Sequence, residues 1–316
     1  MQTTKRLNAS QLKIAAEILR EGGTVAFPTE TVFGLGARFD DSSAVLRVFE
    51  AKGRPSDNPL IVHLAEIEDL DQVCDDVPKM AMSLWNRWAP GPLTLVVPRN
   101  SKVPNIVTAG LDTVAVRIPS HPIARQLIRE AGVPLVAPSA NRSGRPSATT
   151  FQGVLEDLEG RIDAIVCETG CGLGLESTVV DIHQVPPRLL RHGAITEDQL
   201  RSIMPDLERV RSEHEGQVNS PGLRHKHYQP TARVILENHG QEWNGMRIAR
   251  IGMDLGPVGA SIILQRSCAS IEDYAGALYE FFREADRHHA DVILCQPVPE
   301  TGLGLALMDR IRRASQ

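Results

Sequence analysis

Polar and basic side chains gather in short segments next to apolar runs, where they could bind or transform a charged ligand. The segment Pro28–Gly36 combines threonines and a glutamate with two glycines. A second segment, Lys52–Leu60, places Lys52 and Arg54 on either side of a glycine, and His63 lies in the apolar run just beyond it. Two prolines and the glycine fix the backbone there, which suits a preformed site for phosphate. A solvated helix end carries the same residue types, so this segment alone leaves both interpretations open.

A third group of polar residues is spread further along the chain. Arg117 lies inside the apolar run Val114–Ile118, and because an unpaired buried cation is costly, it must be paired or face a cavity. Ser139–Ser147 and Gly172–Thr178 add hydroxyl, amide and basic groups, and Arg191 follows shortly after them. The segments combine many donors and several arginines with few carboxylates, which suits a nucleotide together with a small carboxylate. Each segment also has a plain structural interpretation, and the spacing does not choose a reaction.

Several common functional signatures are absent from the sequence. It contains no GxxxxGK[ST] phosphate-binding loop, no GxGxxG opening a helix, no HExxH zinc motif and no GxSxG nucleophile elbow. The five cysteines are scattered without CxxC pairs, which favours reduced thiols, a cytosolic setting and no structural zinc. The formal charge of −5 excludes a general polycation, so RNA would have to meet a local basic surface.

The chain lacks the apolar segments expected of a membrane or exported protein. No run of about 18 apolar residues occurs, and Met1–Ser10 has no apolar signal core after its basic residues. With 42% apolar and 23% charged residues, the composition is ordinary for a globular enzyme. We therefore expect a soluble, cytoplasmic protein without membrane partners.

The first two thirds of the chain alternate short apolar runs with amphipathic stretches, which predicts an α/β domain with a mixed, twisted sheet ending near Met204. Ser10 is expected to cap a first helix that stops at Gly22. Further helices are expected before Lys52 and at Met80–Trp88, Ile123–Ala131 and Phe151–Leu158. The expected strands are Thr24–Phe27, Leu93–Val97, Val114–Ile118, Leu135–Ala137, Ala164–Cys167 and Thr178–Ile182.

This pattern breaks between Pro205 and Pro230, where turn-forming residues precede a basic and polar stretch. A structureless segment of this length inside a compact protein is a linker or a functional loop. The predicted division is therefore 1–204 for the first domain, 205–231 for a linker or active-site lid, and 232–316 for a small second α/β domain. The elements expected in that domain are strands at Arg233–Leu236, Arg247–Ile251, Ser261–Leu264 and Asp291–Leu294 and helices at Ile271–His288 and Leu305–Arg313.

Six short segments occur together in the order found in the YrdC family. They are Pro28–Gly36, Lys52–Pro55, Asn58–Leu60, Ala115–Pro119, Pro138–Asn141 and Ser177–Val179. The combination covers about the first 200 residues and is much more specific than any single segment. The chain resembles the threonylcarbamoyl-AMP synthases of this family in their two-domain form. The resemblance implies a YrdC-like twisted mixed sheet with flanking helices, plus a smaller Rossmann-like α/β C-terminal domain.

The resemblance also implies a reaction. An L-threonylcarbamoyladenylate synthase is a nucleotidyltransferase that combines L-threonine, bicarbonate and ATP into threonylcarbamoyl-AMP and pyrophosphate, the first stage of making threonylcarbamoyladenosine in tRNA. ATP would be a substrate accompanied by Mg2+, and the product would pass to the downstream tRNA threonylcarbamoyl-transfer machinery. Such chemistry needs no covalent nucleophile, so the protein must align three substrates and stabilise phosphate charge.

The family segments also imply site residues. Lys52, Arg54 and Arg117 would be catalytic, with Arg117 on the threonine carboxylate. Tyr228 would close over the nucleotide and limit hydrolysis of a labile intermediate. The residues implied for L-threonine are Thr31, His63, Arg117, Ser139 and Ser177, and those implied for ATP are Lys52, Arg54, Asn58, Asn141, Ser147, Arg191 and Tyr228. No residue is implied as a metal ligand.

Two other functions stay open on the sequence alone. The same fold occurs in HypF-type hydrogenase maturation factors, which transfer carbamoyl groups, but their cysteine pairs and added modules are missing from this chain. A non-enzymatic RNA-binding factor is the second alternative, because a concave basic surface could receive a duplex backbone. The negative net charge and the 4% aromatic content weaken this alternative, although weak RNA binding could accompany the enzymatic function.

Overall fold

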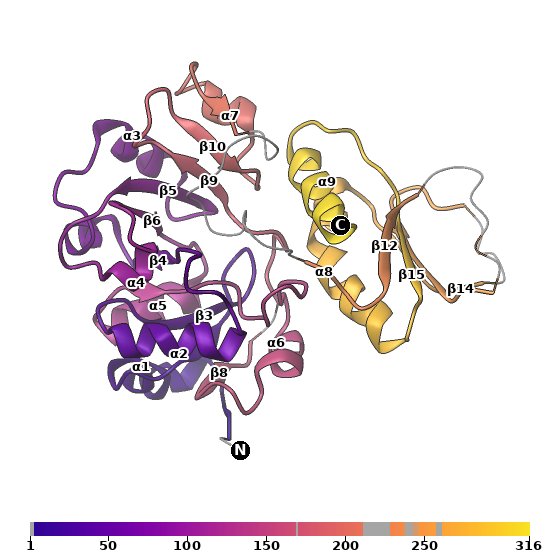
Figure 1. The fold of residues 1–316 in the computed structure, drawn as a ribbon, viewed down its shortest axis with the longest axis horizontal. Helices are drawn as coiled ribbons and strands as arrows, with labels where there is room; N and C mark the ends of the chain where they lie inside the picture. The colour runs from indigo at the N-terminus through magenta and orange to yellow at the C-terminus, as the bar shows by residue number, and fades with distance from the viewer. Residues whose placement is uncertain (1–2, 169, 211–227, 238–242, 244, 257–260) are drawn as a thin grey trace.

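The computed structural model describes residues 3–168, 170–210, 228–237, 243, 245–256 and 261–316. The chain forms two sheets, each with its own helices, and the two parts lie next to each other in space (Figure 1). We call the part up to residue 210 the larger domain and the part from residue 228 onward the smaller domain. The predicted boundaries at residues 204 and 231 stay predictions, because most of the segment between them falls on residues 211–227, outside the described residues.

The larger domain contains a mixed sheet. Its strands are β1 (Lys5–Leu7), β2 (Val25–Phe27), β3 (Gly34–Arg38), β4 (Ile61–His63), β5 (Leu93–Pro98), β6 (Thr113–Arg117), β7 (Leu135–Val136), β8 (Ala164–Val166), β9 (Thr178–Asp181), β10 (Arg188–Arg191) and β11 (Glu208–Arg209). Among the described residues these eleven strands follow the order β1-β8-β2-β3-β7-β4-β6-β5-β9-β10-β11. Strand β1 pairs with β8 in parallel, whereas β2 pairs with β3 antiparallel, which confirms the predicted mixed sheet.

Helices cover both faces of this sheet. They are α1 (Leu12–Arg20), α2 (Ser42–Lys52), α3 (Lys79–Trp88), α4 (Asn105–Thr108), α5 (Pro122–Ala131), α6 (Phe151–Leu158) and α7 (Glu197–Arg201), together with the short 3-10 helices η1 (Ala9–Gln11) and η2 (Ile67–Gln72). Successive residues of β2 point to opposite faces. Val25 and Phe27 pack with α1 and α5, whereas Ala26 belongs to the core under α2, α3, α4 and α6. The sheet therefore has an apolar core on each side.

One local expectation needs correction. The first helical turn is capped by Asn8, whose side chain accepts a hydrogen bond from the Ser10 N–H while Gln11 accepts one from the Asn8 N–H. Ser10 is therefore not the cap, and the sequence was ambiguous because serine and asparagine both cap helices. The last residues of the segment Pro28–Gly36 begin β3, which pairs with β2. Gly36 permits this close pairing, because a Cβ there would lie 2.7 Å from the Phe27 ring.

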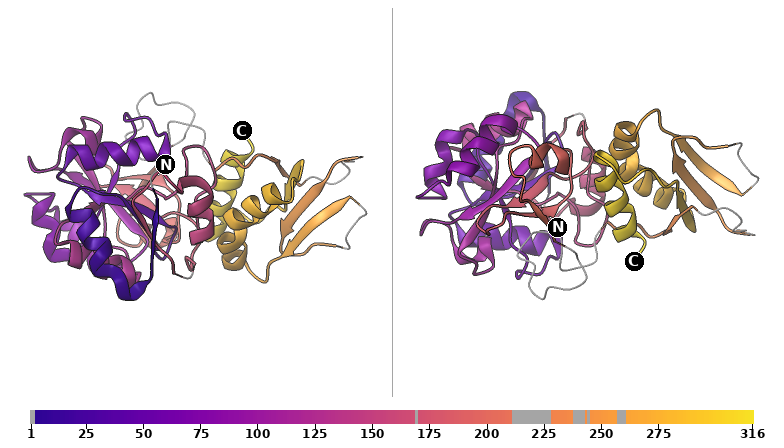
Figure 2. Two further views of the ribbon diagram at one scale, coloured as in Figure 1. Left: turned by 90° about the horizontal axis from the view of Figure 1, so that it is seen from below. Right: turned by 90° about the horizontal axis from the view of Figure 1, so that it is seen from above.

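The smaller domain has an all-parallel sheet with two long helices. Its elements are β12 (Arg233–Leu236), β13 (Ile248–Gly252), β14 (Ile262–Ser267), α8 (Ile271–Arg287), β15 (Val292–Cys295) and α9 (Leu303–Ala314). The strand order is β12-β15-β13-β14, and α8 and α9 lie on the face turned toward the larger domain (Figures 1 and 2). This layout confirms the predicted second α/β unit. None of the helices in the described ranges is long and apolar enough to span a membrane.

Helix α8 packs directly against the larger domain. A Cβ on Gly174, whose φ is +72°, would lie 2.5 Å from the Cα of Gly276, so the two backbones touch. Arg283 of α8 is buried and donates to Asp157 Oδ2 on α6 at 2.8 Å. Asp157 is also fully buried and accepts from Arg145 at 2.6 Å. A buried ion pair therefore links the two domains.

Candidate active site

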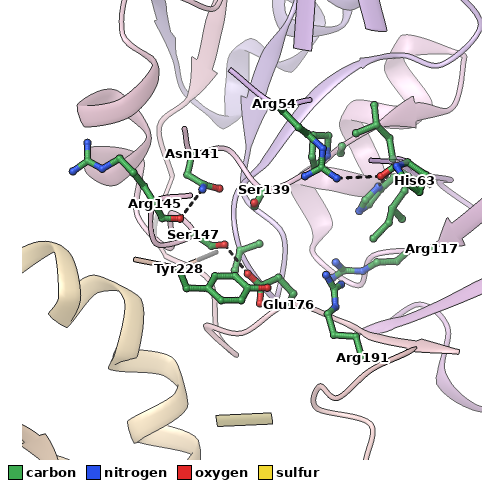
Figure 3. Close-up of a pocket in the computed structure, with 16 residues that line it drawn as sticks. Arg54, His63, Arg117, Ser139, Asn141, Arg145, Ser147, Glu176, Arg191 and Tyr228 are labelled. Atoms are coloured by element: carbon green, nitrogen blue, oxygen red, sulfur yellow. Dashed lines mark hydrogen bonds between the residues drawn. The ribbon is translucent and has the colours of Figure 1, made fainter. Parts of the chain in front are cut away.

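A pocket opens in the larger domain where several strands end and where the smaller domain adjoins it (Figure 3). The empty space within it, counted together with the open solvent at its mouth, is about 620 Å³. Its walls are formed by Val32, Arg54, Pro59, Leu60, Ile61, His63, Arg117, Ala137, Pro138, Ser139, Asn141, Arg145, Ser147, Glu176, Arg191 and Tyr228.

Most of the residues predicted for the site meet at this pocket. Eight of them line it, namely Arg54, His63, Arg117, Ser139, Asn141, Ser147, Arg191 and Tyr228. The other four are at most 2% exposed and lie next in sequence to a lining residue or are hydrogen-bonded to one, namely Thr31, Lys52, Asn58 and Ser177. The structure thus brings the predicted residues together, while their individual roles stay predictions.

Parallel strand pairing places two predicted residues side by side. His63 ends β4, Arg117 ends β6, and the two residues are partners in the register of this pair. Partners in adjacent strands project from the same face of a sheet, and both side chains reach the pocket (Figure 3). Ser139 also lines the pocket, and its backbone forms a bridge with Gly34 at the start of β3.

Arg117 is buried and only partly paired. Its Nη2 donates to Glu30 Oε1 at 2.7 Å, which provides the partner expected of a cation in an apolar strand. Burial alone would raise the pKa of Glu30, but the charge and the hydrogen bond of Arg117 lower it. Arg117 Nε and Glu30 Oε2 are buried without a hydrogen-bond partner among the described residues. Because such atoms are seldom left unsatisfied, this pair suits a ligand that offers an acceptor to Arg117 and a donor to Glu30.

Arg54 and Asn141 leave further hydrogen-bonding capacity open. Arg54 Nη2 donates to Pro59 O at 3.2 Å, but its Nε lacks a partner in the described part of the chain. Burial, reinforced by the charge of Arg191, lowers the pKa of Arg54 to about 10, so it remains a cation at neutral pH. Asn141 donates its amide to two backbone carbonyls at 2.9 Å, and its Oδ1 is likewise unpartnered there. A cation beside an oriented amide suits a phosphorylated ligand.

Lys52 ends α2 and lies behind the loop that carries Ser139 and Asn141. Its ammonium group donates to the backbone carbonyl of Ser139 and to that of Asn141, the latter at 2.6 Å. Burial, together with the charge of Arg54, lowers the pKa of Lys52 well below its ordinary value. In this geometry Lys52 orders the loop that forms one wall of the pocket. A direct contact between Lys52 and ATP stays a prediction.

A second cation approaches Arg117 from β10. Arg191 donates through Nε to Ser177 O at 2.9 Å and through Nη2 to Ser177 Oγ at 3.0 Å. The Ser177 hydroxyl also shares a 2.7 Å hydrogen bond with Thr94. The guanidinium groups of Arg191 and Arg117 point toward one another in the pocket (Figure 3). Two cations so close together favour an anionic ligand between them.

Glu176 and Arg145 line the pocket but were not predicted as site residues. Glu176 accepts hydrogen bonds from Ser147 at 2.6 Å, from Tyr279 of α8 at 3.1 Å and from Arg310 of α9 at 2.9 Å. Two of these donors come from the smaller domain, so no local pattern in the sequence could reveal the cluster. Arg145 contributes mainly its backbone, because its guanidinium points away from the pocket (Figure 3).

Tyr228 reaches the pocket at the junction of the two domains. Its ring stacks on Tyr279 with 5.3 Å between the ring centroids, and the guanidinium of Arg310 lies 5.5 Å from the Tyr228 centroid. The next residue, Gln229, donates its N–H to Gly144 O at 2.8 Å. Tyr228 is therefore held by both domains. Closure of the predicted lid over a nucleotide stays a prediction, since most of residues 205–231 lie outside the described residues.

His63 is buried and uncharged. Burial, together with the charge of Arg117, lowers the pKa of His63 to about 3. Its Nδ1 lies 3.3 Å from Ile61 O, and because a carbonyl can only accept, Nδ1 carries the ring proton. Nε2 is therefore an unprotonated acceptor, suited to the hydroxyl or amine of a ligand.

Replacing His63 by glutamine is expected to make the fold less sensitive to acid. The folded state keeps the imidazole neutral, whereas the unfolded chain takes up a proton near pH 6.5, the ordinary value. Above about pH 6.5 the ring is neutral in both states, so the free energy of unfolding does not depend on it. Below that pH only the unfolded chain takes up the proton, and the free energy of unfolding falls by up to about 1.4 kcal/mol per pH unit. Urea unfolding at about pH 7 and pH 5 should show a larger loss for the unmodified protein than for the variant. Equal losses would contradict this expectation.

Comparisons with known proteins decide the family. The Sua5/YciO/YrdC family model, described as telomere recombination, matches residues 17–193, and the model described as threonylcarbamoyl-AMP synthase, C-terminal domain, matches residues 195–316. The chain is 41% identical to a threonylcarbamoyl-AMP synthase of Pyrococcus abyssi, over 98% of this chain and 96% of that protein. The chain belongs to the threonylcarbamoyl-AMP synthase family. A second member, from Bacillus subtilis, is 40% identical over 98% of this chain and 94% of its own length.

A solved structure of the same family agrees with the fold. The crystal structure of P. abyssi Sua5 complexed with L-threonine matches with a TM-score of 0.91 and 38% identity, covering 100% of this chain and 97% of that one. The match extends over both sheets and confirms the fold class and the family predicted from the sequence segments. Threonylcarbamoyl-AMP synthases are enzymes that form an adenylate, which implies ATP as a substrate of the family.

Proposed function

We propose that the chain is an L-threonylcarbamoyladenylate synthase, which converts L-threonine, bicarbonate and ATP into threonylcarbamoyl-AMP and pyrophosphate. The observation that carries the proposal is the pocket in which Arg54, Arg117 and Arg191 converge with buried polar atoms that lack partners among the described residues. The relative crystallised with L-threonine supports this amino acid as a substrate. The alternatives of carbamoyl transfer and of RNA binding alone lack a comparable observation.

The reaction proceeds in two steps. Bicarbonate dehydrates to CO2 and hydroxide, the threonine amine forms a bond to the CO2 carbon, and the hydroxide takes the proton that the amine loses, leaving a carbamate. A carbamate oxygen then attacks the α-phosphorus of ATP, the bond from that phosphorus to the bridging oxygen breaks, and pyrophosphate leaves. No side chain forms a covalent bond, so the protein contributes alignment and stabilisation of charge.

Threonine is assigned to the part of the pocket near β4 and β6. Arg117 binds its carboxylate, because the free Nε adds a second donor beside the Nη2 that already holds Glu30. His63 accepts from threonine through its unprotonated Nε2, and Ser139 adds a hydroxyl. Thr31 and Ser177, which are fully buried, support this wall from behind.

ATP is assigned to the cationic part of the same pocket. Arg54 and Arg191 bind phosphate oxygens, where their charge offsets that of the attacking and leaving groups. Asn141 and Ser147 bind through their amide and hydroxyl groups. Lys52 and Asn58 act from behind the wall, and Tyr228 covers the nucleotide where the two domains meet.

Mg2+ is assigned to the substrate rather than to the protein. The described residues contain no group of three His, Cys, Asp or Glu side chains that could hold a metal ion. Glu176, the carboxylate in the pocket, already accepts from three side chains. Mg2+ would therefore enter with ATP and would offset the charge of the triphosphate.

The product of the reaction is labile. A mixed anhydride between a carbamate and AMP hydrolyses readily, so it must pass promptly to machinery that transfers the threonylcarbamoyl group to tRNA. We assign this reaction to the cytoplasm, in keeping with the five free cysteines. Weak direct binding of RNA stays a prediction that salt-dependent binding measurements can test.

Pyrophosphate release from ATP is the direct test of this function. The purified chain with MgATP is expected to release pyrophosphate when L-threonine and bicarbonate are both present, and to fall to background when either is omitted. L-serine at the same concentration serves as a matched control for recognition of the β-methyl group. Absence of release from the folded protein with all substrates present would overturn the proposal, and salt-sensitive RNA binding would then favour the RNA-binding alternative.

A further inference from the structure

Glu176 is an unexpected group in a pocket for a triphosphate. It lines the pocket, and its side chain is only 8% exposed. An ionised carboxylate at low exposure repels phosphate strongly, because the surrounding protein screens charge less than water does. The pocket therefore requires a cation that offsets Glu176.

The compensating cation comes from the smaller domain. Arg310 of α9 is fully buried and donates through Nε to Glu176 Oε2 at 2.9 Å. Burial alone would raise the pKa of Glu176, but the charges of Arg310 and Arg191 and the hydrogen bonds from Ser147 and Arg310 lower it to about 2. Glu176 is therefore ionised at neutral pH and is held as an ion pair across the interface.

Arg310 also holds two other parts of the pocket. Its Nη2 donates to the backbone carbonyl of His192 at 2.9 Å, directly after the pocket residue Arg191. Its guanidinium faces the ring of Tyr228. A single side chain of the smaller domain thus contacts Glu176, the end of β10 and the aromatic residue at the junction, while its Nη1 pairs with the neighbouring Asp309. Ser147, which donates to Glu176 at 2.6 Å, is fixed through the same ion pair.

We propose that Arg310 is a positioning residue for the adenylation site, and that the smaller domain completes the nucleotide pocket by neutralising Glu176 and fixing the groups around it. This inference rests on the proposed binding of ATP in the pocket. It gives the smaller domain a defined part in the reaction. The role belongs to ATP binding rather than to threonine binding, because Arg310 contacts Tyr228, which is assigned to ATP, and Glu176, which accepts from the ATP-assigned Ser147.

The test measures binding of MgATP to the full chain by isothermal titration calorimetry without threonine, and the KM for threonine in the pyrophosphate assay. Arg310→Met, which keeps the length of the side chain but removes its charge, is expected to raise the Kd for MgATP by about tenfold or more, with a KM for threonine within about threefold of the original. The double variant Arg310→Met/Glu176→Gln removes both charges and is expected to restore most of the affinity. Arg312→Met is the matched control, since Arg312 is an exposed residue of α9 paired with Glu300, and it is expected to change neither value.

Three results separate this inference from its alternatives. An unchanged Kd in Arg310→Met, or a double variant as weak as the single one, would overturn the charge-neutralising role of Arg310. If Arg310→Met fails to fold, Glu176→Gln alone decides, because removing the carboxylate is expected to tighten MgATP binding and a looser Kd contradicts the proposal. Failure of the unmodified chain to bind MgATP overturns the proposed function together with this inference.

Discussion

Replacing Arg117 by glutamine is expected to lower kcat/KM for threonine by at least about a hundredfold, because charge-assisted hydrogen bonds to the substrate carboxylate are lost. The effect should appear in the concentration of threonine needed for pyrophosphate release, while the Kd for MgATP measured without threonine stays close to that of the unmodified chain. A kcat/KM for threonine within a few-fold of the original would show that another residue binds the carboxylate.

The double variant Arg117→Gln/Glu30→Gln separates recognition of threonine from an indirect effect on folding. Removing Arg117 alone leaves the buried carboxylate of Glu30 without its cation, which is itself destabilising. In the double variant both charges are absent, so thermal stability is expected to recover while threonine recognition does not. If catalysis recovers together with stability, Arg117 acts only through the fold.

Replacing Arg283 by methionine is expected to lower the free energy of unfolding by about 3 to 5 kcal/mol, the usual cost of breaking a buried ion pair. The substitution leaves Asp157, which is fully buried on α6, with fewer compensating donors. The Arg283 guanidinium also donates to Pro146 O, so the loop before the pocket residue Ser147 loses a support. Urea unfolding followed by far-UV circular dichroism measures the change.

Arg287→Met is the matched control for this prediction. Arg287 lies one turn further along α8 and pairs with Glu156 and Glu280, but its side chain is 43% exposed. Exposed pairs contribute less than about 1 kcal/mol, so this variant should unfold close to the unmodified protein. If the free energy of unfolding falls by a similar amount in Arg283→Met and Arg287→Met, the buried ion pair contributes no more to stability than the exposed one.

The fold was predictable wherever an element combined regular spacing with a clear boundary. Helix α6 was predicted with its observed bounds from its helical pattern, and in the structure Thr150 caps it. Strand β12 likewise agrees with its expected range. Strand β1 was missed because three mostly polar residues carry no periodic signal, and its strand character depends on pairing with β8. Tertiary pairing of this kind cannot be read from a local window.

The sequence predicts which segments form the site, but not the hydrogen bonds and ion pairs between them. Arg117 stood out because a cation in an apolar strand requires a partner, and Glu30 proved to be that partner. Lys52 has the residue type of a phosphate ligand, yet the structure directs its ammonium to two backbone carbonyls. Glu176 was missed as a site residue because its significance arises from Tyr279 and Arg310, which reach it only after both domains have folded.

The pairing of β1 with β8 has a consequence for synthesis on the ribosome. Lys5 lies opposite Ala164, and β8 lies between β1 and β2 in the sheet. This edge of the large sheet therefore cannot form until β8, which is translated much later, has been synthesised. At about 5–20 residues per second, the early strands spend roughly 10–30 s without their final neighbour. During that interval the nascent chain exposes apolar surface, as expected for sheets built from distant segments. Chaperone binding to the emerging amino-terminal half would therefore cover the time until β8 leaves the exit tunnel.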